Sequence, residues 1–75
     1  MSVDIKIKIG QRIKELRKKL DFSQEALAYN AEVDRTYITD VENGRRNVSV
    51  EILERIIDAL QVSISEFFNT KEFKK

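Results

Sequence analysis

In four sets of residues along this chain, an apolar residue is followed directly by Ser or Asp, and a second apolar residue comes four positions after that polar one. This pattern is typical of a helix start, where the polar side chain caps the first turn and the two apolar side chains pack together. The four sets are Phe22, Ser23 and Leu27; Val33, Asp34 and Ile38; Val48, Ser49 and Leu53; Val62, Ser63 and Phe67. So many helix starts within 75 residues predict an all-α fold.

Apolar residues with helical spacing follow each start and indicate where the helices run. We predict five short helices in a single domain of residues 1–75, the first ending near Leu20 and the others covering about 24–30, 35–42, 50–60 and 64–69. The start of the first helix stays open, because the alternation of Val3, Ile5, Ile7 and Ile9 fits a strand equally well. Asn43 and Gly44 tolerate the left-handed conformation and end the third helix.

The residue types that are missing exclude several classes of function. The chain has no Cys and no His, so the commonest metal ligands and the commonest general base are absent. We therefore predict no enzyme activity, no metal, no cofactor and no small-molecule ligand. No apolar run is long enough to span a bilayer and no signal-peptide pattern follows Met1, which predicts a cytoplasmic protein without a membrane partner.

Charge is distributed unevenly along the chain although the net charge is only +1. Residues 1–20 contain seven basic and two acidic residues, a balance of +5. Residues 21–43 contain six acidic residues and one basic residue, Arg35, a balance of −5. A molecule with one basic face can still meet phosphates, but a solvated surface of mixed charge explains the pattern as well.

The segment from residue 24 to residue 43 has the spacing of a helix-turn-helix. Only about three residues separate its two predicted helices, and Ala28 is small enough for the helices to cross closely. Val33, Ile38 and Val41 would hold the second helix against the core. Its polar side chains would then face outward, as in a helix that enters the major groove of DNA.

The stretch SQEALAYNAEVDRTYITDVENGRRNVS resembles the Cro/phage-repressor (XRE-type) helix-turn-helix family, and the resemblance covers roughly residues 9–68. It implies a compact five-helix lambda-repressor-like DNA-binding domain. The pieces DRTYI, RNVSVEIL and VSISEFF are similar to the controller proteins of restriction–modification systems within that family. The chain departs from the family at Glu32, where the turn often carries Gly.

The resemblance implies roles for individual polar residues. Contacts to base edges are expected from Arg35, Thr36 and Thr39, and contacts to the DNA backbone from Ser23, Gln24, Tyr37, Asn43, Arg46 and Asn47. Five of them have a plainer alternative: a phosphate contact for Arg35, an ordinary first-turn residue for Gln24, a solvated face for the two threonines, and a core position for Tyr37. Arg45 is expected to be exposed to solvent.

Two protein contacts are also expected. The resemblance assigns Glu25 a possible contact with RNA polymerase, although Glu25 could simply complement the amino terminus of its helix. The last helix, about 63–69, is too short to bury Ile64, Phe67 and Phe68 together, so we predict a homodimer built on Ile64 and Phe68. The alternative is that residues 70–75, otherwise a flexible tail, fold back through Phe73 and cover them.

These expectations combine into a dimeric transcription regulator of a restriction–modification operon. It would bind an inverted-repeat operator in double-stranded DNA, activate its genes and regulate its own expression. A phage or plasmid repressor, or an antitoxin, would share the fold. A protein-interaction module that has lost DNA binding is the alternative from another class, and a recognition helix without Arg and Thr would indicate it.

Overall fold

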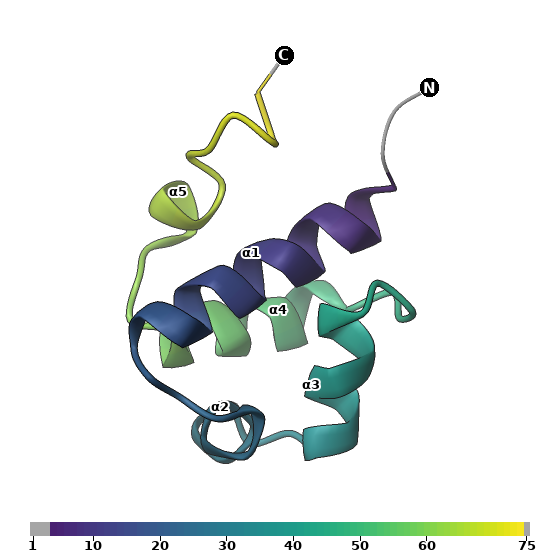
Figure 1. Ribbon diagram of the computed structural model, residues 1–75, viewed down its shortest axis with the longest axis vertical. Helices are drawn as coiled ribbons and strands as arrows, with labels where there is room; N and C mark the ends of the chain where they lie inside the picture. The colour runs from purple at the N-terminus through teal and green to yellow at the C-terminus, as the bar shows by residue number, and fades with distance from the viewer. Residues whose placement is uncertain (1–3, 75) are drawn as a thin grey trace.

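The computed structural model describes residues 4–74, and five helices make up its regular structure (Figure 1). Among these residues there is no strand. The helices are α1 (Ile5–Lys19), α2 (Gln24–Ala31), α3 (Arg35–Glu42), α4 (Val50–Ala59) and α5 (Ile64–Phe67). The predicted all-α class with five short helices is confirmed, and the predicted bounds of α2, α3 and α4 are correct to within one residue.

The first helix begins at Ile5, within the segment whose sequence fits a strand equally well. The Asp4 carboxylate accepts a hydrogen bond from the Lys6 backbone N–H at 2.8 Å and caps the helix, which then includes Ile5 and Ile7. Both isoleucines are exposed, whereas Ile9 packs against the core. The alternating segment is therefore helical from residue 5 onward, and Val3 lies outside the described residues.

Three of the four predicted caps form the expected hydrogen bond. The hydroxyls of Ser23, Ser49 and Ser63 each accept from the backbone N–H three residues later, at 3.0–3.1 Å. Asp34 precedes α3 in an extended conformation, but its side chain makes no capping bond. At that position the cap expected from the sequence is absent, and the carboxylate is exposed beside the start of α3.

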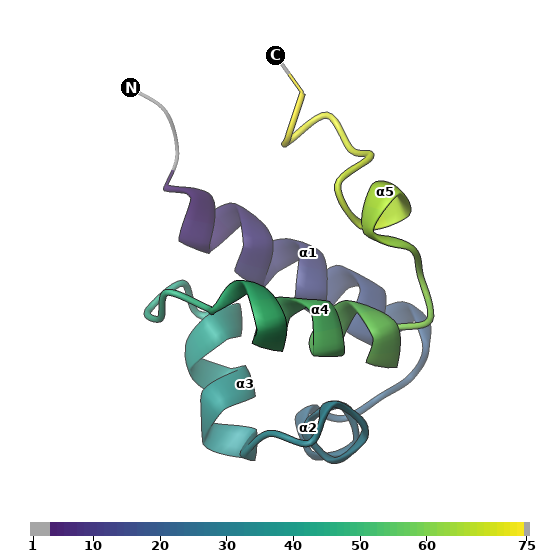
Figure 2. The same ribbon diagram turned by 180° about the vertical axis from the view of Figure 1, so that it is seen from behind.

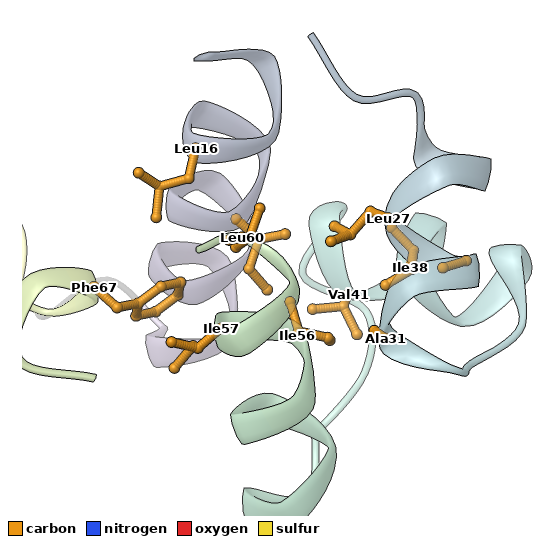
Figure 3. Packing of buried hydrophobic residues seen from close by; sticks show 11 residues of the cluster. Leu16, Leu27, Ala31, Ile38, Val41, Ile56, Ile57, Leu60 and Phe67 are labelled. Carbon is orange, nitrogen blue, oxygen red and sulfur yellow. The ribbon is translucent and has the colours of Figure 1, made fainter. Parts of the chain in front are cut away.

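Side chains from all five helices meet in one core (Figure 3). The fully buried members are Ile13 of α1, Leu27 of α2, Ile38 and Val41 of α3, Ile56 and Ile57 of α4, Leu60 directly after α4, and Phe67 of α5. Phe67 reaches in beside Ile57, which ties the short last helix to the rest of the domain. Fully burying each side chain of this size contributes roughly 1.5–3 kcal/mol.

The helix-turn-helix lies at one end of the molecule. In Figure 1, α2 is seen nearly end-on while α3 runs along the page, so the two helices cross steeply. Figure 2, from behind, shows the same arrangement, with α5 at the opposite end from α2. None of the helices within residues 4–74 has the length and apolar character needed to cross a membrane.

The chain turns between α2 and α3 at a residue that is not glycine. Glu32 has φ 60° and ψ 45°, the left-handed conformation that costs a residue with a Cβ roughly 1–2 kcal/mol. Arg55 of α4 stabilises this turn, since Nε donates to the Ala31 carbonyl at 3.1 Å and Nη2 to the Glu32 carbonyl at 2.9 Å. The departure from glycine therefore leaves the turn intact.

The last helix is shorter than predicted, because α5 ends at Phe67 rather than at residue 69. After it, the Phe73 N–H donates to the Thr70 carbonyl at 3.1 Å, so a turn forms where a flexible tail is expected. The Phe73 ring lies edge-on to the Phe68 ring, with 4.9 Å between the centroids. The tail thus folds back on part of the surface predicted for dimerisation.

Candidate nucleic-acid interface

The outer side of α3 carries the side chains predicted to read bases. Ile38 and Val41 point into the core, which turns Arg35 and Thr36 of the first turn toward solvent. Neither of these two side chains has a hydrogen-bond partner within the described residues 4–74, and the Arg35 guanidinium pairs with no carboxylate there. A guanidinium fork and a hydroxyl are thus available to an external ligand.

Thr39, one turn further along α3, is connected to α2. Its hydroxyl donates to the Gln24 side-chain oxygen at 2.9 Å, and the Arg35 carbonyl is a second acceptor at 3.2 Å. The Gln24 amide nitrogen in turn donates to Glu42 Oε1 at 3.0 Å. Gln24 retains one amide hydrogen for a phosphate, so its predicted role stays chemically possible while its position is fixed from within.

A buried ion pair holds this network in place. The Arg17 guanidinium of α1 donates to both Glu42 oxygens, at 2.6 Å to Oε2 and 3.0 Å to Oε1, and also to the Phe22 carbonyl at 2.7 Å. The Glu42 side chain is only 2% exposed. Two groups that look like ordinary surface charges in the sequence therefore lock α1 to the end of α3.

The loop after α3 is fastened to the helix by a second arginine. The Arg46 guanidinium lies over the Tyr37 ring, 4.5 Å from its centroid, and its Nη2 is 3.6 Å from an oxygen of Asp40. Tyr37 is half-buried and packs partly against the core, so it is not a pure core residue, and its contact to the DNA backbone stays a prediction. The arrangement holds a cation beside the outer face of α3.

Other predicted backbone contacts surround the same face. Asn43 and Asn47 are exposed where the chain leaves α3, and Gly44 takes φ 73° to turn it. Arg45 is also exposed, as predicted for a residue outside the site. Asn43 itself has φ −90°, so of the two residues only Gly44 is left-handed. Ser23 uses its oxygen as the cap of α2, which leaves the hydroxyl hydrogen free to donate to a phosphate.

The outer face of α2 is acidic and aromatic. Glu25, in its first turn, is exposed, as expected for either of its predicted roles. Tyr29 follows one turn later and is 84% exposed, far more than an aromatic ring in a core would be. Tyr29 is not among the predicted site residues, because an aromatic residue at helical spacing is normally assigned to the core.

The two predicted dimer residues have different environments. Ile64 is 54% exposed, which agrees with a place on an interface. Phe68 is half-buried between Phe67 and Phe73, with 4.9 Å between its ring centroid and each of theirs. The fold-back considered as an alternative therefore covers Phe68 in one protomer but leaves Ile64 uncovered.

Three arginines outside the predicted site have structural roles that sequence reasoning missed. Arg17 pairs with Glu42, and Arg55 holds the turn before α3. Arg12 donates from Nε to the Phe67 carbonyl at 2.7 Å and from Nη2 to the Glu66 carbonyl at 2.8 Å, so it caps the end of α5. Apart from the local pair of Arg12 with Glu15, their partners are backbone carbonyls or a distant acid, which leave no local pattern in the sequence.

Two relatives of known type are similar to this chain in sequence over most of its length. The control protein C.MunI of Mycoplasma sp is 49% identical over 70 residues, which cover 92% of this chain and 95% of that protein. The control protein C.BamHI of Bacillus amyloliquefaciens is 43% identical over 63 residues, 83% of this chain and 78% of that protein.

Solved structures give the same result. The restriction–modification controller protein C.Esp1396I, solved as a tetramer with its natural 35-base-pair operator, superposes with a TM-score of 0.89 at 37% identity, covering 99% of this chain and 100% of that one. The controller protein C.AhdI from Aeromonas hydrophila gives 0.80 at 41% identity, covering 84% and 96%. The helix-turn-helix family pattern itself matches residues 13–67. The chain therefore belongs to the helix-turn-helix family, and it is similar to the controller proteins of restriction–modification systems within it.

Proposed function

We propose that this protein is a transcription regulator of a restriction–modification operon that binds an inverted repeat in double-stranded DNA as a homodimer in the cytoplasm. It activates transcription at low occupancy and represses its own gene at high occupancy. The observation that carries the proposal is the outer face of α3, where Arg35 and Thr36 are exposed and have no protein partner within residues 4–74, on a helix held by the core. The likeness to controller proteins over nearly their whole length supports the operon assignment.

The geometry of α3 supports major-groove reading. A helix that exposes its amino-terminal side chains can place them against base edges, and an Arg fork fits guanine O6 and N7. Ser23, Gln24, Asn43, Arg46 and Asn47 surround this face and supply hydrogen-bond donors for phosphates on either side of the groove. A protein-interaction module would not require this set of donors.

Selection of bound duplexes from a random pool tests the proposal, and Arg35→Ala makes the test specific. We expect this variant to lose roughly 1–3 kcal/mol of operator affinity, since a bidentate base contact is removed. Its affinity for random duplex should hardly change. Measured dissociation constants for both duplexes decide the matter: an equal loss on the two would make Arg35 a phosphate contact instead.

Arg46 should act on every sequence alike. Removing its charge in Arg46→Ala should weaken operator and random duplex together and reduce the slope of log affinity against log salt by about 0.9, one phosphate's worth. Gln24→Ala is the matched control, because Gln24 is neutral and its loss should weaken binding with almost no change in slope. Titrations at several salt concentrations measure both, and an unaltered slope for Arg46→Ala would contradict the assignment.

Dimerisation follows from the amount of sequence that must be read. One recognition helix contacts only a few base pairs, whereas two-fold pairing doubles the reading and sets the two helices about 34 Å apart, one turn of DNA. The exposed Ile64 supports an interface on α5. Phe68 would join this interface if the partner protomer displaced the Phe73 ring or packed beside it.

We expect Ile64→Glu to give a folded monomer with severely weakened operator binding, because a charge at the centre of an apolar interface cannot be hydrated there. Phe68→Glu should have the same effect on assembly, but it also disturbs the contacts of Phe68 with Phe67 and Phe73 within one protomer. Sedimentation together with circular dichroism distinguishes these effects. A stable Ile64→Glu dimer would place the interface elsewhere.

Activation requires a surface for RNA polymerase, and the face of α2 next to the DNA is the candidate. Glu25 is exposed there, and Tyr29 lies one turn away on the same side of the helix. An acid so close to DNA reduces affinity, so a contact with polymerase gives it a purpose that DNA binding alone does not. A Glu25→Gln variant that still represses but no longer activates a reporter gene would support this role.

A repressor of a phage or plasmid is the second candidate, and relatives of that kind exist. The immunity repressor protein of Bacillus phage phi105 is 40% identical over 57 residues, but those residues make up only 40% of that repressor. The match to C.MunI covers 95% of that protein. Agreement in length favours a controller protein, and an adjacent endonuclease gene would decide between the two.

A further inference from the structure

A chain of hydrogen bonds runs from the interior of the domain to the face of α3 that we assign to DNA. It starts at Arg17 and passes through Glu42 and Gln24 to the hydroxyl of Thr39, over donor–acceptor distances of 2.6–3.0 Å. The first two members are buried, and the last two are partly buried. Thr39 is therefore the only one of the four that lies on the recognition helix and also reaches its outer side.

The direction of every bond in this chain is fixed by its buried end. A guanidinium can only donate, and a carboxylate paired with it can only accept. Gln24 must then turn its amide nitrogen toward Glu42, because its oxygen in that place would face a carboxylate oxygen 3.0 Å away with no hydrogen between them. The Gln24 oxygen is left for Thr39, whose hydroxyl has to be the donor.

The Thr39 hydroxyl has a single hydrogen, and both of its protein neighbours are acceptors. Besides the Gln24 oxygen at 2.9 Å, the one other partner among residues 4–74 is the carbonyl of Arg35, at 3.2 Å. The hydrogen thus stays inside the protein whichever of the two it chooses. What Thr39 offers outward is lone pairs alone.

We infer that Thr39 reads an exocyclic amino group in the major groove, cytosine N4 or adenine N6, and makes no direct bond to a phosphate. Those amino groups are the hydrogen-bond donors of the major-groove edges, whereas guanine O6, thymine O4 and phosphate oxygens are acceptors. The inference rests on the proposed function, since it requires α3 to lie in the groove. Thr36 differs, because its exposed hydroxyl has no protein partner within residues 4–74 and can rotate to donate or accept.

The test combines protein variants with base analogues at one position of the selected operator. Thr39→Val removes the hydroxyl with little change of shape, and Thr39→Ser keeps it as the rescue variant. A comparison of selected sequences first identifies the base pair whose preference is lost in Thr39→Val and kept in Thr39→Ser. In one duplex, the adenine or cytosine of that pair is then replaced by an analogue without its exocyclic amino group. In another, the thymine or guanine of that pair is replaced by an analogue without its major-groove carbonyl, O4 or O6.

We expect loss of the amino group to weaken wild-type binding about 3–10-fold more than it weakens Thr39→Val, as one hydrogen bond would. Loss of the carbonyl should weaken both proteins equally. A modified duplex that pairs more weakly affects both proteins alike. A displaced Gln24 in Thr39→Val would lower the affinity for every duplex alike. Both effects therefore cancel in this comparison. Thermal unfolding of the three proteins verifies that they are equally folded.

Coupling of Thr39 to the carbonyl, or a Thr39→Val variant that binds all sequences equally more weakly, would overturn the inference. So would a Thr39→Val variant with unchanged preferences. These outcomes leave the proposed function intact, because the wild-type protein would still select an operator. A wild-type protein that selects no duplex at all would overturn the proposed function, and this inference with it.

Discussion

Glu42→Ala is expected to lower the free energy of unfolding by about 3–5 kcal/mol, because it leaves the Arg17 guanidinium buried without its counter-charge. A domain of this size has roughly 5–15 kcal/mol in total, so the variant should unfold at much lower urea concentration. The loss should exceed that of an exposed ion pair such as Lys6 with Asp4, which contributes about 0–1 kcal/mol.

A double variant serves as its control. Replacing both charges, as in Arg17→Met with Glu42→Leu, removes the desolvation cost of the pair and should restore most of the stability, since apolar replacements of buried ion pairs are often neutral. Full recovery is not expected, because the Phe22 carbonyl also loses its donor. A loss of under about 1 kcal/mol in Glu42→Ala would mean that water reaches the pair and that the account of its burial is wrong.

Gly10→Ala is the second variant from which we expect a large loss of stability. An added Cβ would lie 2.2 Å from the Val41 carbonyl oxygen and 2.9 Å from that of Glu42, both of them backbone atoms that cannot rotate away. Alanine in place of glycine favours a helix by roughly 0.5–1 kcal/mol. Overpacking costs about 1–3 kcal/mol or more, and contacts this short place it at the upper end, so the clash decides the sign.

Gln11→Ala is the matched control for this prediction. It changes the next residue of α1, which is exposed, and should alter stability by no more than about 0.5 kcal/mol. Urea unfolding of both variants gives the comparison. If Gly10→Ala proved as stable as the wild type, α1 and α3 would have to lie further apart than the structure shows.

The helices after α1 could be predicted because their starts depend on local chemistry. A serine cap and its flanking apolar residues need no information from elsewhere in the chain, so α2, α4 and α5 begin where predicted. The start of α1 could not be predicted, because Ile5 and Ile7 fit two periodicities and both remain exposed. The Asp4 cap decides in favour of the helix, and a single carboxylate gives a weak signal in the sequence.

The outward residues of the candidate site could be predicted, but the means of holding them could not. Arg35 and Thr36 are exposed because the apolar residues of α3 occupy the side of the helix that faces the core. The pairing of Arg17 with Glu42 joins residues 25 positions apart and has no periodicity to reveal it. Because these two charges are buried against each other, the surface of residues 1–20 is less basic, and that of residues 21–43 less acidic, than the sequence suggests.

The clamp that Arg55 places on the turn before α3 has a consequence for how this DNA-reading element could be moved between proteins. The segment of residues 24–43 includes the side chains that face outward, but the turn within it is held from α4 and its end is held from α1. A graft of that segment alone would transfer the side chains that face outward without the contacts from α4 and α1 that hold them in position. Exchanging only outer side chains such as Arg35 and Thr36 is the route by which a scaffold of this kind can acquire a new operator while keeping its fold.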